Sequence, residues 1–321
     1  MAWSSDVTER LPTNSALLLE IEPSQPTDIL DMARRHADAI ESALAAHGAV
    51  LLRGFDLSGE SVLATLFERL WASPLSYVYR STPRTTVGKG VYTATEYPSA
   101  QEIPMHNENA YQRDWPTRIG FHCVTPSDTG GQTPLADVAR VTARIDPAVV
   151  AEFRERKVSY VRNYSDFIDL PWRTVFQTES KSAVAEYCRA HDIDFSWTDD
   201  GLTTRQVCQG TTRHPESGEE LWFNQAQLFH VSSLGLEMMS QMIDTFGERG
   251  LPRNAYFGDG GAIPNKVIAH VSDAFEQEKV IFNWRKNDIL ILDNMRVAHG
   301  RKPFTGSRRI LVSMGRPYSS V

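Results

Sequence analysis

Apolar residues recur at helical spacing in several stretches of the chain. The clearest stretch covers residues 28–46, where apolar side chains fall on one face and a glycine follows as a stop signal. Comparable stripes predict further helices over residues 58–70, 147–156, 181–191, 233–249 and 264–277. We expect the stripe of the 233–249 helix, which includes Leu236, Ile243 and Phe246, to pack into the core.

Short, nearly continuous apolar runs predict buried strands between these helices. They cover residues 49–54, 118–124, 158–163, 288–294 and 308–314. Residues 1–26 are expected to be irregular, and the glycine-rich residues 258–261 predict a loop. Short strands interleaved with a few helices indicate a mixed α/β fold class.

Two short segments, far apart in the sequence, carry candidate metal ligands. His106 and Glu108 flank Asn107, and alternate side chains of an extended run share one face, so the imidazole and the carboxylate are expected to point the same way. The second segment supplies His299. Two histidines and one carboxylate can occupy one face of an octahedral iron(II) ion and leave the other positions open. The His-x-Glu motif alone is weak, because it occurs by chance and most of the nine histidines are expected to be structural.

A second pair of segments favours a bound anion. The paired glycines at 130–131 permit a tight turn that can present the Thr133 hydroxyl, although an ordinary hairpin turn would look the same. Arg308 and Arg309 open an apolar run, and a buried guanidinium is costly unless it meets an anion. Alternate residues of a strand face opposite ways, so only one of the two can point inwards. Arg308 is the favoured anchor, Arg309 is the alternative, and a surface pair of arginines is the third possibility.

The spacing of these candidates bears on domain organisation. Because His106 and His299 are separated by most of the chain, one site must be built from both halves, and we expect a single domain over residues 1–321. Residues 164–220 are rich in aromatic and polar side chains. We interpret this segment as an insertion over the mouth of the site, a candidate lid.

Together these motifs resemble the taurine dioxygenase family of iron(II)/2-oxoglutarate oxygenases, and most closely its branch containing the syringomycin-biosynthesis aspartyl hydroxylase. The matching segments, in the family's order, are LLRGF at 51–55, YTATEYP at 92–98, MHNE at 105–108, GGQTPLAD at 130–137, WFN at 222–224 and AHGRKPF at 298–304. The resemblance implies a double-stranded β-helix, the jelly-roll or cupin-like core, with flanking helices and the lid insertion.

The resemblance also implies the chemistry. The two histidines and the glutamate would hold iron(II), and the arginine and Thr133 would receive the distal carboxylate of 2-oxoglutarate. With dioxygen, the enzyme would decarboxylate 2-oxoglutarate to succinate and hydroxylate a C–H bond of an amino acid or its derivative in natural-product biosynthesis. Candidate substrate contacts, each of which could instead be a structural hydrogen bonder, are Tyr92, Thr93, Glu96, Asn107, Tyr111, Arg162 and Asn224.

Two departures from the wider family narrow the expectation. The carboxylate ligand is Glu108 where aspartate is usual, and its presence favours oxygenation, because the related halogenases lose this carboxylate. Sulfonate-binding members carry a further arginine four residues after the co-substrate arginine. Val312 and Ser313 stand there, which argues against taurine. Desaturation or cyclisation with the same cofactors, a zinc hydrolase on the same three ligands and a non-catalytic jelly roll are the alternatives.

Composition sets the remaining limits. The net charge of −7 argues against nucleic acid as a partner, and the longest apolar runs are too short to cross a membrane. Three cysteines without paired spacing, and the lack of a leader-like start, favour reduced thiols and a cytoplasmic location. The expected partner is a small-molecule substrate, free or tethered to a carrier protein, and a homo-oligomer remains open.

Overall fold

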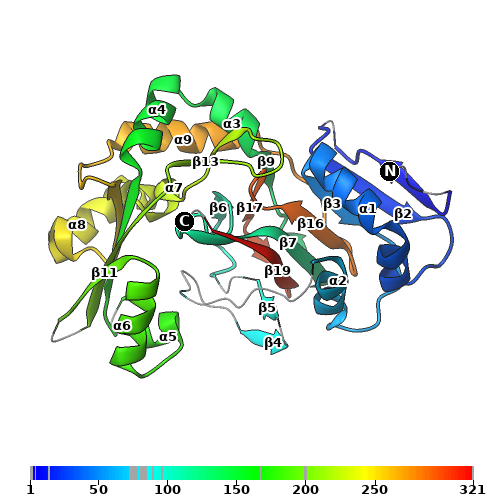
Figure 1. Ribbon diagram of the computed structural model, residues 1–321, viewed down its shortest axis with the longest axis horizontal. Helices are drawn as coiled ribbons and strands as arrows, with labels where there is room; N and C mark the ends of the chain where they lie inside the picture. The colour runs from blue at the N-terminus through cyan, green and yellow to red at the C-terminus, as the bar shows by residue number, and fades with distance from the viewer. Residues whose placement is uncertain are drawn as a thin grey trace.

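The computed structural model describes residues 3, 5–13, 15–71, 79, 85–88, 90–94, 97–166, 168–198 and 201–319. An eight-stranded sheet forms the centre of the fold (Figure 1). Its strands, in spatial order, are β1 (Val7–Arg10), β2 (Leu18–Pro23), β3 (Ala49–Leu52), β16 (Ile289–Asp293), β7 (Asp114–Thr125), β19 (Arg309–Ser319), β5 (Val91–Thr93) and β4 (Thr86–Gly88). The sheet therefore joins segments from both ends of the chain, as a site shared between the two halves requires.

The first two strands correct the expectation that residues 1–26 are irregular. β2 pairs parallel with β3, and β1 pairs antiparallel with β2. Leu18 and Ile21 are fully buried in this arrangement. The periodicity of so short an apolar run does not distinguish a strand from a loop. β2 forms because its backbone pairs with that of β3, a contact between segments that local sequence preference does not reveal.

Two helices, α1 (Ile29–His47) and α2 (Val62–Trp71), cover one face of this sheet. The Asp28 carboxylate accepts hydrogen bonds from the first-turn amides of Leu30 and Asp31 and so caps α1. A Cβ atom at Gly120 would lie 2.3 Å from the ring of Phe67, so α2 packs directly on the backbone of β7. The predicted helices at 28–46 and 58–70 are thus confirmed, with slightly different ends.

A second sheet forms the other side of the molecule. Its strands, in order, are β11 (Ile193–Trp197), β12 (Leu202–Cys208), β10 (Val158–Tyr164) and β15 (Arg253–Phe257). The helices α5 (Trp172–Phe176) and α6 (Lys181–Ala190) lie beside it, at the lower left of Figure 1. The segment 164–220 therefore supplies two strands of this sheet, β11 and β12, and the other two strands come from before and after it in sequence.

Smaller elements complete the fold. A three-stranded sheet consists of β6 (Ile103–His106), β17 (Val297–Arg301) and β9 (Leu135–Asp137), and short pairs join β8 (Thr129–Gly130) to β18 (Phe304–Thr305) and β13 (Thr211–Arg213) to β14 (Glu220–Trp222). The remaining helices are α3 (Val138–Arg144), α4 (Pro147–Arg156), α7 (Ala226–Phe229), η1 (Val231–Leu234), α8 (Leu236–Gly250) and α9 (Asn265–Gln277). The predicted helices at 147–156, 181–191 and 264–277 are confirmed.

The α8 helix forms where a helix was predicted, but its apolar stripe does not enter the core. None of its residues is buried, and Leu236 has 79% of its surface exposed. Ile243 and Phe246 are also exposed. The expectation of core packing is wrong here because periodicity reveals an amphipathic face and not what, if anything, covers it.

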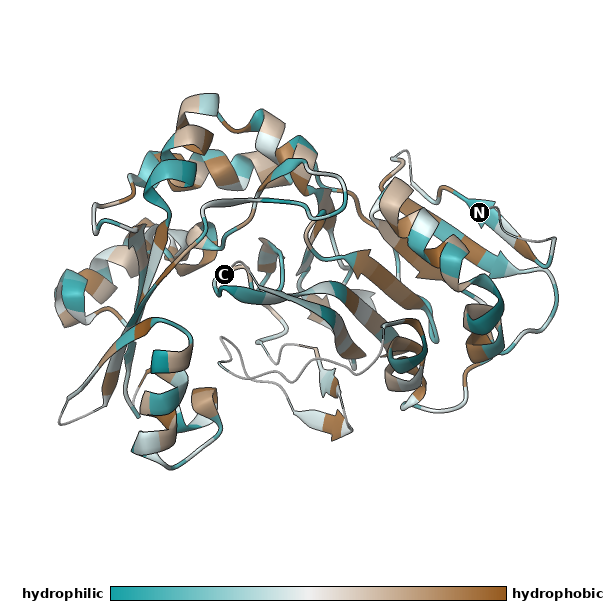
Figure 2. Ribbon diagram, viewed as in Figure 1, coloured by the Kyte–Doolittle hydropathy of each residue, from teal (hydrophilic) through white to brown (hydrophobic). Residues whose placement is uncertain are grey.

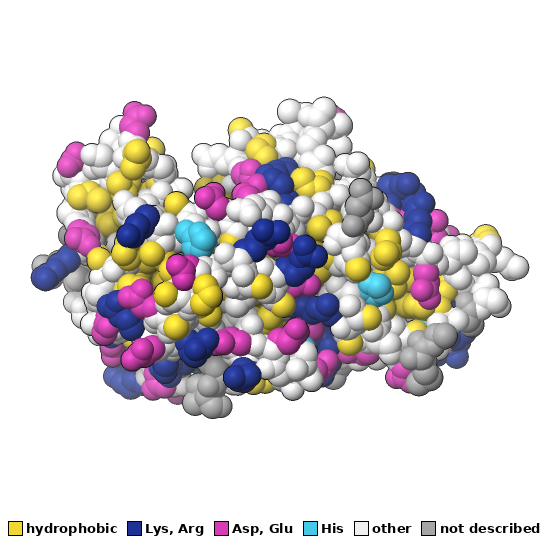
Figure 3. All heavy atoms as spheres, turned by 90° about the horizontal axis from the view of Figure 1, so that it is seen from above, with side chains coloured by type: hydrophobic (Ala, Val, Ile, Leu, Met, Phe, Trp, Pro, Cys, Tyr) yellow, Lys and Arg dark blue, Asp and Glu magenta, His cyan; other side chains and the backbone are white. Residues whose placement is uncertain are grey.

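The hydropathy colouring in Figure 2 places the most apolar strands, including β16, at the centre of the main sheet. On the face drawn in Figure 3, cationic and anionic side chains are intermingled. No helix among the described residues is long and apolar enough to cross a membrane. All three cysteines, Cys123, Cys188 and Cys208, are free and buried.

The buried histidine under α2 leads to a prediction on stability. His122 is 3% exposed, and burial lowers its pKa although Glu60 and Asn287 act in the opposite direction. Below the ordinary pKa of about 6.5 the unfolded chain takes up a proton that the folded chain does not, so stability is lost as the pH falls. When the pH falls from 7.5 to 5.5, we expect the His122→Leu variant to lose less unfolding free energy than the wild-type protein, by up to about 1.4 kcal/mol per pH unit. Urea unfolding of both proteins at both pH values measures this difference. If the variant lost as much unfolding free energy as the wild-type protein, His122 would not be the source of the pH dependence.

Candidate active site

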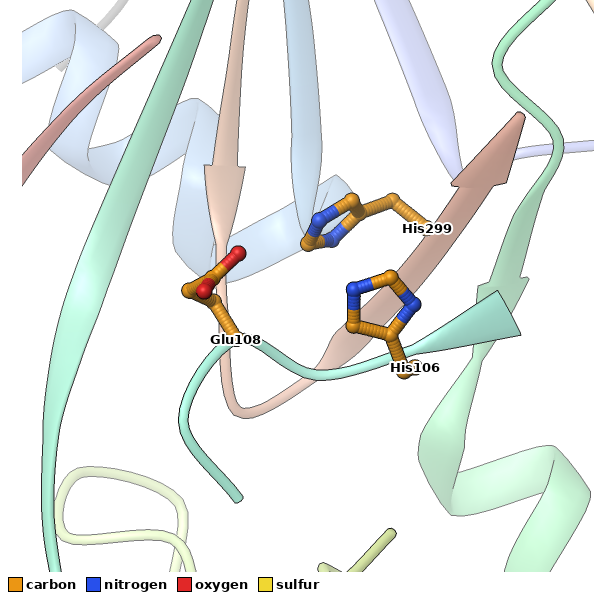
Figure 4. Close-up of side chains that lie close together, drawn as sticks. All are labelled: His106, Glu108 and His299. Atoms are coloured by element: carbon orange, nitrogen blue, oxygen red, sulfur yellow. The ribbon is translucent and has the colours of Figure 1, made fainter. Parts of the chain in front are cut away.

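Three side chains that could hold a metal ion converge at the three-stranded sheet of β6, β17 and β9. One ligand atom from each of His106, Glu108 and His299 lies within 4.8 Å of the others. Figure 4 shows the three side chains pointing towards a common space. Among the described residues this is the one group of three or more such side chains. The structure thus brings together the three residues selected from the sequence.

Strand pairing places the two histidines. His106 and His299 are direct partners in the antiparallel pair of β6 and β17, and their ring centroids are 4.8 Å apart. The strands come close at Gly300, where a Cβ atom would lie 2.6 Å from the carbonyl oxygen of Ile103. A side chain at position 300 would therefore push β6 away and separate the two imidazoles.

The orientation of each ring is fixed by a neighbour. The Nδ1 atom of His106 donates a hydrogen bond to the Pro104 carbonyl, 2.8 Å away, which leaves Nε2 as the ligand atom. The ring of Phe121 packs edge-on against His299, with centroids 5.0 Å apart. A metal-binding histidine typically donates its other N–H to a carbonyl or carboxylate, so the donor set fits a metal ion.

Glu108 follows β6 and is held by a side chain from the other half of the chain. The backbone N–H of Glu108 donates to Oδ1 of Asn294 (2.8 Å), and Nδ2 of Asn294 donates to the backbone carbonyl of Glu108 (3.0 Å). Asn107 in turn donates to the backbone carbonyl of Asn294 (2.6 Å). Asn294 is fully buried. This reciprocal pairing fixes the peptide that carries the carboxylate.

The turn that supplies Asn294 is stabilised by Asp293. Its Oδ1 accepts the backbone N–H groups of Met295 and Arg296, and its Oδ2 lies 3.0 Å from both Arg118 and His214. Burial alone would raise the pKa of Asp293, but the His214 contact and the Arg118 charge hold that pKa below its usual value. The ionised carboxylate therefore fixes the link between β16 and β17, from which His299 extends.

Asn294 is expected to position Glu108 for metal binding. Asn294→Ala removes both bonds to the Glu108 peptide, and we expect manganese or iron affinity to fall by about 10- to 100-fold. The matched control is Asn254→Ala, which removes another buried asparagine whose carbonyl accepts a backbone N–H outside the site. Calorimetric metal titration of both variants is the measurement. Equal metal affinities in the two variants would show that Asn294 contributes only to stability.

A pocket next to the triad collects the predicted anion-binding groups. It is lined by Ala94, Ile103, His106, Phe121, Thr133, His299, Gly300, Arg301, Arg308 and Ile310. The indole N–H of Trp284 donates to the Thr133 hydroxyl oxygen (3.1 Å), which leaves the Thr133 hydroxyl proton available to an acceptor. The pocket therefore combines one hydroxyl donor, two guanidinium groups and an apolar wall.

The two consecutive arginines occupy different environments. Arg308 donates from Nε to the Gly131 carbonyl (3.0 Å), and among the described residues no carboxylate pairs with it. Burial, together with the charge of Arg301, lowers the pKa of Arg308 to about 10. Arg309 is exposed and pairs with Glu60 at 2.6 Å. The structure therefore places Arg308 in the pocket and Arg309 on the surface.

The asparagines considered as substrate contacts use their amides within the protein. Asn107 donates to backbone carbonyls behind the triad. Asn224 donates to the Gly210 carbonyl (2.6 Å) and accepts the N–H of Ala226 (2.9 Å). Both are 1% exposed. Their contacts are those of structural hydrogen bonders.

Four other substrate candidates, Tyr92, Thr93, Tyr111 and Arg162, are not among the described residues that line the pocket. Tyr92 is buried in the cluster that contains Phe121. The Thr93 hydroxyl accepts the N–H of Thr85, and the Tyr111 hydroxyl donates to a carbonyl. Arg162, on β10, is buried against the rings of Tyr79 and Tyr164. Glu96 lies outside the described residues.

Sequence reasoning missed three residues of this site: Asn294, Trp284 and Arg301. The first ends an apolar strand run, which was a usable signal, since a polar side chain there is buried only with partners. Trp284 and Arg301 gave no signal of their own, because their roles depend on which segments meet in space.

Two histidines and one carboxylate next to a pocket with two guanidinium groups are the arrangement expected of a mononuclear non-haem iron oxygenase. Residues 13–314 match the family described as taurine catabolism dioxygenase TauD, TfdA family. The chain belongs to this family, as the sequence motifs predicted. It is therefore an enzyme that uses iron(II), 2-oxoglutarate and dioxygen.

Similar proteins agree with this assignment. The chain is 41% identical over 276 residues to the dapdiamide synthesis protein DdaC of Enterobacter agglomerans, covering 86% of this chain and 84% of the relative. It is 30% identical to a clavaminate synthase-like protein of Arabidopsis thaliana, covering 86% and 83%.

Solved structures show the same fold. PvcB of Pseudomonas aeruginosa matches with a TM-score of 0.58 and 16% identity, over 98% of this chain and 92% of the other. A taurine dioxygenase from Burkholderia xenovorans matches with a TM-score of 0.56 and 14% identity, over 98% and 92%.

Proposed function

We propose that this enzyme hydroxylates an unactivated C–H bond of an amino acid or amino-acid-derived small molecule in natural-product biosynthesis. The observation that carries the proposal is Glu108 beside the two histidines, because a complete carboxylate-containing triad suits oxygen transfer. The similarity to a dapdiamide synthesis protein over most of both chains supports a biosynthetic role.

In this proposal His106, Glu108 and His299 hold the iron. When bound, the metal and 2-oxoglutarate supply the oxidising chemistry, with decarboxylation of 2-oxoglutarate to succinate. The protein's own contribution is positioning. Asn294 fixes the peptide of Glu108, and the Pro104 carbonyl fixes the ring of His106, so the ligands need not reorganise when the metal binds.

Arg308 and Thr133 bind the distal carboxylate of 2-oxoglutarate. The guanidinium can form charge-assisted bonds with it, and the Thr133 hydroxyl can donate because Trp284 occupies its acceptor side. Phe121 and Ile310 form an apolar wall that excludes water from this end of the pocket. The co-substrate would thus be held in one orientation relative to the triad.

We propose further that the main sheet and the β6–β17–β9 sheet are the two faces of a jelly roll, within one domain. Residues 164–220 would act as the lid. They supply β11 and β12, the two strands at one edge of the second sheet, and the helices α5 and α6 beside it. Among the substrate candidates, Arg162 suits a substrate carboxylate by its charge and burial, whereas Asn107 and Asn224 are assigned to positioning.

The test is a mass-spectrometric screen of free and carrier-bound amino acids under oxygen-18 gas. A product that gains one labelled oxygen, with succinate formed in equal amount, supports hydroxylation. A loss of two hydrogens without label would reject hydroxylation in favour of desaturation or ring closure. Turnover only on substrates unrelated to amino acids would overturn the substrate assignment.

A further inference from the structure

A second buried arginine lies in the same pocket as Arg308. Arg301 is 6% exposed and follows His299 by two residues on β17. The guanidinium carbons of Arg301 and Arg308 lie 5.1 and 5.6 Å from the centroid of the Phe304 ring. Both cations therefore lie beside one aromatic side chain, the charge of Arg301 acts on Arg308, and the two arginines line the pocket together with His106 and His299.

Arg301 cannot leave this position easily. Its two terminal nitrogens donate to the backbone carbonyls of Tyr97 (2.9 Å), Pro98 (2.7 Å) and Gln101 (2.7 Å). These bonds tie the guanidinium to the segment that leads into β6. Neutral carbonyls orient a cation but do not cancel its charge.

No carboxylate among the described residues compensates the charge of this arginine pair. Across the ranges that the structure describes, neither Arg301 nor Arg308 has a carboxylate in an ion pair, and the buried Nε of Arg301 has no acceptor. A buried cation without a counter-ion is costly, and a like-charged neighbour adds to the cost. An anion between the two would relieve both penalties.

We propose that Arg301 is a specificity-determining residue of the co-substrate pocket. Together, Arg301 and Arg308 make this pocket prefer a 2-oxo acid that has a second carboxylate. This rests on the proposed placement of 2-oxoglutarate. Arg308 and Thr133 contact the distal carboxylate, and Arg301 supplies a second fixed positive charge whose attraction acts on that carboxylate. A 2-oxo acid without the distal carboxylate lacks the group on which this attraction acts at that end of the pocket.

The experiment is calorimetric titration of the Mn(II)-loaded protein, which avoids turnover. The probes are 2-oxoglutarate and 2-oxopentanoate, in which a methyl group replaces the distal carboxylate. We expect Arg301→Gln to weaken 2-oxoglutarate binding by about tenfold and to leave 2-oxopentanoate binding nearly unchanged. Arg301→Lys, which keeps the charge, should restore most of the preference for 2-oxoglutarate.

The matched control is Arg296→Gln, because Arg296 also holds backbone carbonyls, those of Ala45 and Ala46, but outside the pocket. It should leave both titrations unchanged. Equal weakening of both 2-oxo acids by Arg301→Gln would mean that Arg301 only supports the fold, and an unchanged preference would also overturn the inference. If the wild-type protein itself did not prefer 2-oxoglutarate, the proposed co-substrate site would be wrong rather than the role of Arg301 alone.

Discussion

Replacement of His106, Glu108 or His299 by alanine is expected to abolish stoichiometric iron binding and turnover while the chain stays folded. Each substitution removes one of three ligand atoms that lie within 4.8 Å of one another, and no further group of this kind occurs among the described residues to replace it. We expect metal affinity to fall by more than about 100-fold, beyond the usual effect of losing an outer-shell partner. Metal analysis after gel filtration, with circular dichroism for folding, measures both outcomes.

The control for this series is His230→Gln. His230 is buried, and its Nδ1 contacts the Ser232 hydroxyl rather than the triad. This variant should retain iron. If it lost iron while His299→Ala kept it, the assignment of the triad would be wrong.

Arg308→Ala is expected to weaken 2-oxoglutarate binding by more than tenfold, because truncating one partner of a buried charge pair costs about 2–5 kcal/mol. Arg309→Ala should have little effect, since Arg309 is exposed and pairs with Glu60. The apparent 2-oxoglutarate constant of each variant is the measurement. The opposite pattern would move the anchor to Arg309, and no effect from either substitution would remove both from the site.

The sequence motifs selected the three residues that the structure brings together, but the strands β6 and β17 that carry the two histidines were not among the predicted strands. An apolar run followed by a polar end predicted β16. The spacing of His106 and Glu108 predicted that their side chains point the same way; the two do lie together, although β6 ends at His106 and Glu108 lies in the turn that follows it. What sequence could not supply was the register that sets His106 opposite His299, because strand partners far apart in the chain are chosen by tertiary packing.

The choice between Arg308 and Arg309 shows the same limit. Alternation predicts that one of the two faces inwards, but only the structure shows Glu60 beside Arg309 and the triad pocket beside Arg308. Asn107 and Asn224 looked suited to a substrate because they are polar residues in matched motifs. Their amides instead satisfy buried backbone groups, which a sequence pattern cannot distinguish from ligand contacts.

We propose that one triad and one arginine-lined pocket together form the active site. A crystal structure of the protein with Mn(II) and N-oxalylglycine, a dicarboxylate that resembles 2-oxoglutarate, tests it most directly. We expect one metal ion bound by His106, Glu108 and His299, with the distal carboxylate of the ligand on Arg308 and Thr133. A metal ion held by other residues, or a distal carboxylate on Arg309, would contradict it.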